Sequence, residues 1–406
     1  MSAEIRVLTA AEIPLLPRLF SYNDAEEMFR AAKARMDAGK MEIYALFLDG
    51  ILQGELRVSF DNSDPDEDTA DGVTLPGVRA YLYAFRVHDD VQGQGWGQRL
   101  LRHTLDALRQ KGYCEFTIGV EDDNHLARHI YEKHGFTEVI ARCEESYQGD
   151  SYEYDLLLKR DDQNIYDNPT FFDGYRALRQ NPASANELIE KPALFDLCPD
   201  LAGKRVLDMG CGYGENCREF ARRGAAEVMG IDISEKMLAV AEAENDCENV
   251  HFRRHSMSDL AALPGKFDVI FSSLAVHYVQ DFPVLMRAAA DHLTEGGRLI
   301  FSQEHPLTTA VTDGSYWYRD ESGRVLHYKL TDYGNSGRRS TRWFVDNVIK
   351  YHRTFSEIVC ALADAGFCIE EMREPIPSPE IIDRYPTYAK DVHKPDFLLI
   401  RARKNR

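Results

Sequence analysis

An apolar run that ends in an acid and three alternating glycines constrains this chain more than any other feature. Residues 205–214 read RVLDMGCGYG, so a predicted strand passes through Asp208 into Gly210, Gly212 and Gly214. Glycine has no Cβ, which lets the backbone take positive φ angles and lets a ligand approach bare peptide groups. In open parallel sheets, ligands bind at the carboxyl ends of the strands. The stretch therefore predicts a parallel sheet with a binding site at its carboxyl edge.

A second predicted strand, residues 228–234, contains an acid of its own near its end. Asp232 lies about 20 residues beyond the glycines, where an acceptor for a ribose 2′,3′-diol is expected. A dinucleotide fingerprint reads G-x-G-x-x-G and directs a pyrophosphate to a helix N-terminus. Here the glycines read G-x-G-x-G and Asp208 precedes them. A carboxylate there would repel a phosphate but suits an ammonium group.

These residues resemble motif I of the class I S-adenosylmethionine (SAM) methyltransferases. The resemblance continues through residues 267–278, a fourth strand with its loop, and residues 293–301, the turn into a fifth strand. It spans roughly residues 165–406 and implies a Rossmann-like doubly wound sheet with S-adenosyl-L-methionine as cofactor. The positions that it assigns to cofactor binding are Tyr175, Arg179, Asp208, Gly210, Cys211, Gly212, Asp232, Ile233, Met257, Asp259 and Ser272.

Two parts of this assignment have open alternatives. Residues 171–179 look like the lid helix that precedes motif I in many small-molecule methyltransferases, with Tyr175 and Arg179 on one face. Either the helix covers SAM, with Arg179 toward its carboxylate, or it is an ordinary amphipathic helix. For the contact to the adenine amino group, the run 255–264 admits either Asp259 or the backbone of Ser256 and Met257.

Methyl transfer is an in-line displacement, and it depends mainly on holding the nucleophile and the methyl group close and aligned. A base is needed only where the acceptor is protonated. His277 and His305 lie at carboxyl ends of predicted strands, so each is a candidate catalytic base, with a structural histidine as the alternative. The loop 272–278 lacks the [DN]-P-P-[FY] run of methylases that act on nucleic-acid bases, which favours small-molecule acceptors.

An aromatic-rich insertion is expected at about residues 307–350, where methyltransferases carry substrate-recognition structure. Its aromatic side chains either form a cage for a cationic or flat acceptor or make the small core of a lid. They are Tyr316, Trp317, Tyr318, Tyr328, Tyr333 and Trp343.

A second glycine-rich turn lies in the amino-terminal half of the chain. The predicted strand 80–88 leads into QGQGWG at residues 92–97 and then into a helix over residues 98–110. Such a turn presents free N–H groups backed by the positive end of a helix dipole, which is a cradle for a pyrophosphate. No G-K-[ST] follows, so a nucleotide-hydrolysing P-loop is not expected.

Together with residues 124–136, NHLARHIYEKHGF, this turn looks like motifs A and B of the GNAT superfamily of N-acetyltransferases. The resemblance covers about residues 3–159 and implies a mixed-sheet α/β fold that binds acetyl-CoA. In this superfamily a backbone N–H of the strand ending at Val87 polarises the thioester carbonyl. The positions assigned to the cofactor are Phe85, Val87, Gln92, Gln94, Gly95, Gly97, Gln98, Asn124 and Tyr131.

Tyr131 occupies the family's position for the general acid that protonates the departing thiolate, with a packing aromatic as the alternative. An ordinary phenol has a pKa of about 10 and a thiol of about 8.5, so this transfer runs uphill unless the site shifts one of them. The base that takes the proton of the amine is left open between Glu55, Glu121, His88 and a water chain.

Length and composition set limits on both halves. A chain of 406 residues is expected to form two domains, here 1–160 and 161–406, joined at the polar run 161–164. The net charge of −19 argues against nucleic-acid binding, and no apolar stretch is long enough to span a bilayer. Eight cysteines without metal-ligand spacing are typical of a reducing compartment, so a cytoplasmic protein with no metal site is expected. The acidic run 61–72 predicts a solvated loop.

The sequence therefore predicts a bifunctional transferase that acetylates and methylates small molecules, with cationic or amine-bearing acceptors favoured. In one alternative, the amino-terminal domain is a non-catalytic acetyl-CoA-binding regulatory module. In another, the methyltransferase modifies RNA, which the negative charge disfavours.

Overall fold

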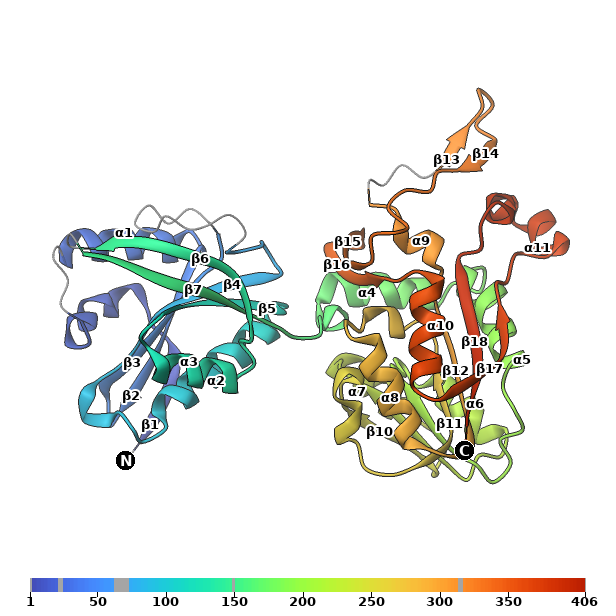
Figure 1. The fold of residues 1–406 in the computed structure, drawn as a ribbon, viewed down its shortest axis with the longest axis horizontal. Helices are drawn as coiled ribbons and strands as arrows, with labels where there is room; N and C mark the ends of the chain where they lie inside the picture. The colour runs from blue at the N-terminus through green and yellow to red at the C-terminus, as the bar shows by residue number, and fades with distance from the viewer. Residues whose placement is uncertain (1, 21–24, 62–72, 148–149, 313–316, 406) are drawn as a thin grey trace. The chain divides into compact units, whose positions relative to one another are not determined.

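The computed structural model describes residues 2–405 apart from 21–24, 62–72, 148–149 and 313–316. It contains two compact units, Met1–Gln163 and Asn164–Arg406 (Figure 1). Tyr316 and nearly all of the acidic run 61–72 lie outside the described residues. Within the described part of the chain, no helix combines the length and the apolar character needed to cross a membrane.

A seven-stranded mixed sheet forms the centre of the amino-terminal unit. Its strand order is β1-β2-β3-β4-β5-β7-β6, and β4 and β5 are its parallel pair. The strands are β1 (Ala3–Val7), β2 (Met41–Leu48), β3 (Ile51–Ser59), β4 (Arg79–Val87), β5 (Glu115–Glu121), β6 (Glu138–Tyr147) and β7 (Asp150–Arg160). Strand β6 was not foreseen from the sequence.

Helices cover both faces of this sheet because side chains alternate along each strand. On β2, Tyr44 and Leu46 join the core that includes α2 (Trp96–Gln110) and α3 (His125–Lys133). Ile43 and Ala45 face the opposite core, with the 3-10 helix η1 (Ala10–Arg18) and α1 (Ala25–Asp37).

Strand β4 separates from β5 half-way along its length. The two pair only from Arg79 opposite Glu115 to Leu82 opposite Ile118. Ala84 then has a φ of 47°, and the pairing of β4 with β3 shifts register there, which marks a β-bulge. Beyond the bulge, the edge of β4 that faces β5 is left without ladder hydrogen bonds to it.

The carboxyl-terminal unit contains a doubly wound sheet with the order β10-β9-β8-β11-β12-β18-β17. The first five strands are parallel, β18 runs antiparallel to them, and β17, which pairs antiparallel with β18, runs in their direction again. The strands are β8 (Arg205–Met209), β9 (Glu227–Asp232), β10 (Val250–Arg254), β11 (Phe267–Ser272), β12 (Leu293–Glu304), β17 (Phe367–Arg373) and β18 (Phe397–Lys404). The predicted fold classes of both units are confirmed.

Both faces of this second sheet are buried. On β8, Leu207 packs with α8 (Phe282–His292) and α10 (Phe355–Asp364). Val206 packs on the other face, with α5 (Lys191–Asp196), α6 (Glu215–Arg222) and α7 (Glu235–Ala243). Burial on both faces explains why these strands read as nearly continuous apolar runs.

The remaining elements surround the carboxyl edge of the sheet or project from it. Before the sheet come η3 (Ile165–Asp167), α4 (Pro169–Arg179) and η4 (Asn186–Glu190). After β12 come α9 (Pro306–Ala310) and two hairpins, β13–β14 (Trp317–Arg319 and Val325–Tyr328) and β15–β16 (Gly337–Trp343 and Val345–His352). The β13–β14 hairpin extends away from the sheet (Figure 1). Shorter segments of this unit are η5 (Met257–Ala262), η6 (Val276–Tyr278), α11 (Pro379–Arg384) and η7 (Pro386–Val392), and the amino-terminal unit contains η2 (Asp89–Val91).

Candidate functional site

The three glycines after β8 differ in the space that a Cβ would have at each position. Their φ angles are 73° at Gly210, 52° at Gly212 and 70° at Gly214. A Cβ on Gly210 would lie 2.5 Å from the Cβ of Ala275, and one on Gly214 would lie 2.5 Å from the ring of Phe252. A Cβ on Gly212 would meet nothing within 4 Å. Packing therefore requires two of the glycines, and the third faces open space beside the turn.

Asp232 holds this turn in place. Its Oδ2 accepts the N–H of Gly212 at 2.9 Å, and its Oδ1 accepts the N–H of Ser234 at 2.9 Å. Burial raises the pKa of Asp232, and the N–H groups of Ser234 and Gly212 oppose that rise. The side chain remains partly exposed. A carboxylate offers about four lone-pair positions, so two remain for ribose hydroxyls.

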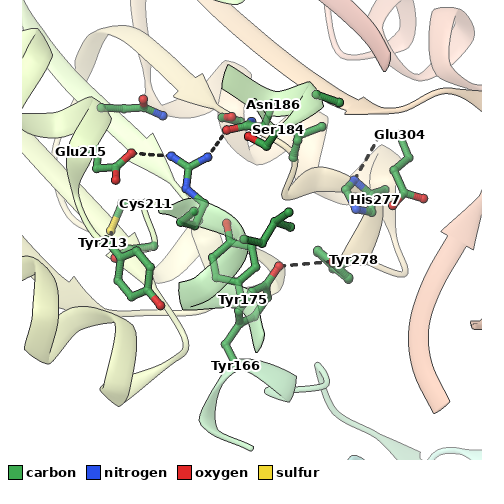
Figure 2. A pocket seen from close by; sticks show the side chains of 18 of the residues that line it. Tyr166, Tyr175, Ser184, Asn186, Cys211, Tyr213, Glu215, His277, Tyr278 and Glu304 are labelled. Atoms are coloured by element: carbon green, nitrogen blue, oxygen red, sulfur yellow. Dashed lines mark hydrogen bonds and ion pairs between the residues drawn. The ribbon is translucent and has the colours of Figure 1, made fainter. Parts of the chain in front are cut away.

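A cavity of about 240 Å³, called the glycine-turn cavity here, opens beside Gly212 (Figure 2). Its walls come from segments far apart in the sequence: the turn, the lid helix α4, the loop after β11 and the end of β12. Figure 2 shows Tyr166 and Tyr175 between Tyr213 and Tyr278. Its lining includes Tyr166, Tyr175, Arg179, Asn186, Gly210, Cys211, Gly212, Tyr213, Glu215, His277, Tyr278, Glu304 and Trp343.

Aromatic contacts fix the lid helix over this cavity. The ring of Tyr166 meets that of Tyr175 edge-on at 5.1 Å, and its hydroxyl lies 3.3 Å from the hydroxyl of Tyr278. Trp343, at the tip of β15–β16, meets Tyr175 edge-on at 6.0 Å. A Cβ on Gly174 of α4 would lie 2.6 Å from the ring of Phe344. The lid and the hairpin tip therefore interlock.

Arg179 lines the cavity but is already paired within the chain. Its guanidinium bonds to Glu215, the first residue of α6, and lies 3.3 Å from Glu187. It also donates to the side chain of Asn186. By contrast, the hydroxyl of Tyr213 is buried and has no hydrogen-bond partner among the described residues. An unpartnered buried hydroxyl in a cavity wall fits a bound polar ligand.

A neutral histidine and an ionised glutamate meet at the far side of the cavity. The Nδ1 of His277 accepts the backbone N–H of Glu304 at 3.4 Å, and burial lowers the pKa of His277 to about 4. The Glu304 side chain pairs with Lys350, which holds the pKa of Glu304 below its usual range despite burial. At neutral pH, His277 is therefore a potential proton acceptor.

In the amino-terminal unit, the glycine turn packs directly against the end of β4. The side-chain amide of Gln92 donates to the carbonyl of Val87 at 2.9 Å and to Asp89 at 2.8 Å. A Cβ on Gly97 would lie 3.4 Å from the side chain of Val87, so glycine permits the close approach of α2. Gly95 precedes α2 with a φ of 81° and open space around it. The first N–H groups of α2 have no intrahelical acceptors and are available to an anion.

Tyr131 lies beside the separated part of β4. Its ring centroid is 6.3 Å from that of Phe85, and burial raises its pKa. Asn124 caps α3, accepting the N–H of Ala127 at 3.0 Å. The side chain of Gln94 donates to the carbonyl of Asp90 at 3.3 Å, and Gln98 lies in the first turn of α2.

The three candidate base residues of this unit differ in their surroundings. His88 caps η2, and its Nδ1 accepts the N–H of Asp90 at 3.3 Å. Glu55 is fully buried, and its oxygens bond to Arg86 at 2.8 Å and Arg57 at 2.9 Å. Glu121 is exposed at the end of β5.

Comparisons with known proteins agree with both sets of motifs. A family model described as "Methyltransferase domain" matches residues 206–297, and one described as "Acetyltransferase (GNAT) family" matches residues 12–136. A solved structure of a putative S-adenosylmethionine dependent methyltransferase from Listeria monocytogenes is 36% identical, covering 53% of this chain and 97% of that chain with a TM-score of 0.50. One from Mesorhizobium loti is 37% identical, covering 56% and 100%, also with a TM-score of 0.50. The chain belongs to the SAM-dependent methyltransferases.

The methyltransferase relatives extend to proteins without a known role. An uncharacterized protein of Haemophilus influenzae is 42% identical over 248 residues, 59% of this chain and 97% of that protein. A ubiquinone biosynthesis O-methyltransferase of Neisseria meningitidis is 40% identical over 107 residues, 25% of this chain and 45% of that enzyme. The match to the O-methyltransferase thus spans less than half of its length. The amino-terminal part is a GNAT acetyltransferase domain.

Several positions that the sequence assigned to SAM do not line the glycine-turn cavity of the methyltransferase unit. Asp208 is fully buried and accepts the thiol of Cys217 at 3.3 Å, because alternation along β8 directs it toward α6. Ser272 is buried and donates to the carbonyl of Met209 at 2.8 Å. Asp232, at the end of β9, is also outside this lining and reaches the cavity only through its bond to Gly212. Ile233, Met257 and Asp259 follow β9 and β10, outside the lining, and Asp259 is exposed.

His305 has a structural position in the methyltransferase unit. Its Nδ1 accepts the N–H of Leu307 at 3.1 Å and caps α9, and its Nε2 lies 2.8 Å from Glu374. Both ring nitrogens are thus engaged, and His305 lines neither of the cavities described here. The structural alternative fits this residue.

The aromatic residues of the insertion do not form one cage. Trp317 and Tyr328 pack together at 4.9 Å and line a second cavity of about 300 Å³, and Trp343 lines both this cavity and the glycine-turn cavity. Tyr318 stacks on His327, and the Tyr333 hydroxyl accepts the N–H of Phe355 at 2.9 Å. Three of the described aromatics of the insertion thus meet at the second cavity, and Tyr318 and Tyr333 make other contacts.

Several wall residues of the glycine-turn cavity were not among the site residues expected from the sequence. Tyr213 stands between two motif glycines and Glu215 directly follows the third, so their positions pointed to the site. Tyr166 and Glu304 are distant from the glycine motif in the sequence, and only the fold brings them to the cavity.

Proposed function

We propose that the methyltransferase unit transfers the methyl group of SAM to a small-molecule acceptor, and that the GNAT unit transfers the acetyl group of acetyl-CoA to an amine. The observation that carries the first half is the open face of Gly212 beside the partly exposed carboxylate of Asp232. For the second half it is the separation of β4 from β5 in front of the α2 N-terminus.

In the methyltransferase unit, Asp232 would accept the ribose hydroxyls and the Gly212 backbone would lie against the cofactor. Tyr213 supplies an unpartnered hydroxyl to the wall of the cavity. SAM, when bound, supplies an electrophilic methyl group. The interlocked lid and hairpin would limit the access of water. With a pKa of about 4, His277 is a weak base and would take a proton only from an acceptor group of comparably low pKa.

In the GNAT unit, the free N–H groups at the start of α2 would hold the pyrophosphate of acetyl-CoA. The unpaired backbone of β4 beyond Ala84 would carry the N–H that polarises the thioester carbonyl. Tyr131, beside Phe85, would protonate the departing thiolate. Glu121 is exposed at the end of the neighbouring strand and is more accessible than the candidate base Glu55.

A regulatory acetyl-CoA-binding module is the second candidate for the GNAT unit. The ion pairs of Glu55 with Arg86 and Arg57 favour the regulatory module, because they give this candidate base a structural role in place of a catalytic one. Burial also raises the pKa of Tyr131, which makes the phenol a weaker acid in the absence of ligand. The RNA-modifying alternative has no support in the net charge of −19.

Transfer of labelled groups tests the proposal directly. Purified protein would be incubated with labelled SAM or labelled acetyl-CoA and a panel of amines, phenols and carboxylic acids. We expect methyl transfer that Asp232→Ala abolishes and acetyl transfer that Gly95→Trp abolishes. Each variant serves as the control for the other reaction. Acetyl-CoA binding without acetyl transfer to any amine would favour the regulatory module.

A further inference from the structure

The second cavity adjoins the methyl-transfer site and has a different electrostatic character. It shares Glu304 and Trp343 with the glycine-turn cavity, so the two meet at these residues. Its other walls come from α9, the two hairpins and the segment around η7. We call it the hairpin cavity. An acceptor seated there would present its reactive end toward the cavity that holds the cofactor.

Cations outnumber carboxylates around the hairpin cavity. Its described lining holds five cationic side chains and two carboxylates, although the chain as a whole carries a net charge of −19. An acidic protein that gathers positive charge at one cavity has a local preference for anions. The cations are Arg339, Arg342, Lys350, Lys390 and Lys394, and the carboxylates are Glu304 and Asp396.

The three lysines already occupy the aromatic faces of this cavity. The ammonium groups of Lys390 and Lys394 lie 5.3 Å and 5.9 Å from the ring centroid of Trp317. That of Lys350 lies 5.3 Å from the ring of Trp343. A cationic acceptor would compete with these lysines for the rings and would be repelled by their charge. The cage for a cationic acceptor is therefore filled by the protein itself.

The lysines are paired with carboxylates, but Arg339 has hydrogen-bonding capacity to spare. Lys350 pairs with Glu304, Lys394 with Asp396 and Lys390 with Asp391. Arg339 donates to the backbone carbonyls of Arg338, at 3.2 Å, and Asn335. Its Nε is buried with no hydrogen-bond partner in the described structure.

A guanidinium in this state suits an incoming anion. Burial lowers the pKa of Arg339, and the Asp332 carboxylate offsets this in part. Arg339 lines the cavity, so an oxyanion there could accept a charge-assisted hydrogen bond from its guanidinium. Arg342, three residues further along β15, also lines the cavity, and its exposed side chain lies 3.5 Å from the carboxylate of Asp346.

We propose that the hairpin cavity binds the methyl acceptor and that this acceptor is an anion, a carboxylate or phosphate joined to an apolar or aromatic body. Arg339 holds the anionic group, and Trp317, Tyr328 and Trp343 pack against the body. This inference rests on the proposed methyl transfer and names the substrate class for it.

Fluorine NMR of protein labelled with 5-fluorotryptophan tests the proposal without turnover. The chain has three tryptophans, of which Trp317 and Trp343 line the hairpin cavity and Trp96 lies in the GNAT unit. The protein would first be saturated with S-adenosylhomocysteine, and then titrated separately with benzoate, phenyl phosphate, benzamide and benzylamine. Failure of S-adenosylhomocysteine to bind would count against the methyl-transfer function itself, which separates that failure from failure of the acceptor assignment.

We expect benzoate or phenyl phosphate to shift the Trp317 and Trp343 resonances and to leave Trp96 unmoved. Their dissociation constants should be about tenfold or more below those of benzamide and benzylamine. The comparison of the two anions distinguishes a carboxylate acceptor from a phosphate one. Benzamide or benzylamine binding as tightly as the anions, or no shift with either anion, would overturn the proposal.

Variants locate the anion within the cavity. Arg339→Met should weaken anion binding about tenfold, and Arg339→Lys should restore part of it because the charge remains. Lys390→Met removes a positive charge of the cavity that comes from η7 and not from β15–β16, and it should also weaken anion binding. Lys204→Met, an exposed lysine before β8, is the matched control and should bind the anions as the wild type does. Equal affinities in Arg339→Met and Lys204→Met would contradict the role of Arg339.

Discussion

The carboxylate of Asp232 accepts the backbone N–H of Gly212 across 2.9 Å. The acid proposed to bind the cofactor ribose is thus the acid that fixes the turn beside the cofactor. Its second oxygen accepts the N–H of Ser234, where α7 begins. Local stability and cofactor binding are therefore coupled at one side chain.

Asp232→Asn should reduce both properties. An amide keeps one acceptor and directs a donor at one of the two N–H groups, so we expect unfolding to become easier by about 1–3 kcal/mol. S-adenosylhomocysteine should also bind more weakly. Urea unfolding without ligand and calorimetry with it measure the two effects. Glu235→Gln, which alters an exposed carboxylate on α7, is the control. If Asp232→Asn were as stable as the wild type, Asp232 would not be the residue that links the stability of the turn to cofactor binding.

Alanine at Gly210 and at Gly212 should have different consequences. Both positions have positive φ, which costs a residue with a Cβ about 1–2 kcal/mol. Only Gly210→Ala also forces a Cβ against Ala275, at a further cost of about 1–3 kcal/mol. Thermal unfolding should show Gly210→Ala as the less stable variant, whereas Gly212→Ala should lose more of the stabilisation that S-adenosylhomocysteine gives. Full ligand stabilisation of Gly212→Ala would show that the cofactor does not lie against this turn.

Tyr131→Phe separates catalysis from binding in the GNAT unit. If the phenol protonates the thiolate, the variant should lose about 10²–10⁴-fold in acetyl transfer at an unchanged acetyl-CoA affinity. The packing against Phe85 does not require the hydroxyl, so the fold should persist. Steady-state rates and calorimetry on the same preparations provide the measurement. Unchanged turnover would assign Tyr131 to packing alone.

His277 should make the methyltransferase unit sensitive to acid. Burial lowers the pKa of His277 from 6.5 to about 4, so between these values the unfolded chain takes up a proton that the folded protein excludes. The contribution of neutral His277 to the free energy of unfolding is fully present above pH 6.5 and is lost as the pH falls toward 4. At pH 5 this loss amounts to about 2 kcal/mol.

The comparison with His277→Asn isolates this contribution, because asparagine does not titrate and retains an acceptor for the N–H of Glu304. Urea unfolding at pH 7 and pH 5 would be followed by tryptophan fluorescence in a Trp96→Phe background, which restricts the signal to Trp317 and Trp343. The wild type should lose about 2 kcal/mol more than His277→Asn between the two pH values. Equal losses would show that His277 is not the responsible group.

The parts of the structure that depend on local sequence could be predicted. The two glycine turns, the strands that lead into them and the position of Asp232 follow from residue type and spacing over about 30 residues, the extent of one strand–helix–strand unit. A backbone N–H on the strand ending at Val87 was expected from the family resemblance, but the position at which β4 separates from β5 was not foreseen, because Ala84 gives no sign of its positive φ.

The cavity walls could not be predicted, because they join segments distant in the sequence. Glu304 lies at the end of β12 and pairs with Lys350 of β16. Lys390 and Lys394 come from the segment around η7 and reach Trp317 of another hairpin. The net charge of the whole chain is negative, so it gives no indication that these cationic side chains gather at one cavity. The sequence therefore favoured a cationic methyl acceptor, and the structure favours an anion.

The directions in which individual motif side chains point also could not be predicted from the sequence. Arg179 and Asp208 were expected to face the cofactor, but Arg179 is paired with Glu215 and Asp208 points toward Cys217. Motif positions specify residue types, and the direction of each side chain depends on neighbours that a motif does not contain.

Calorimetric titration with acetyl-CoA and, separately, with S-adenosylhomocysteine tests the central claim most directly. The proteins are the wild type, Gly95→Trp and Asp232→Ala. The account predicts that the wild type binds both ligands, that Gly95→Trp loses only acetyl-CoA, and that Asp232→Ala loses only S-adenosylhomocysteine. A wild-type protein that binds S-adenosylhomocysteine but not acetyl-CoA would contradict the two-cofactor account and limit the function to methyl transfer.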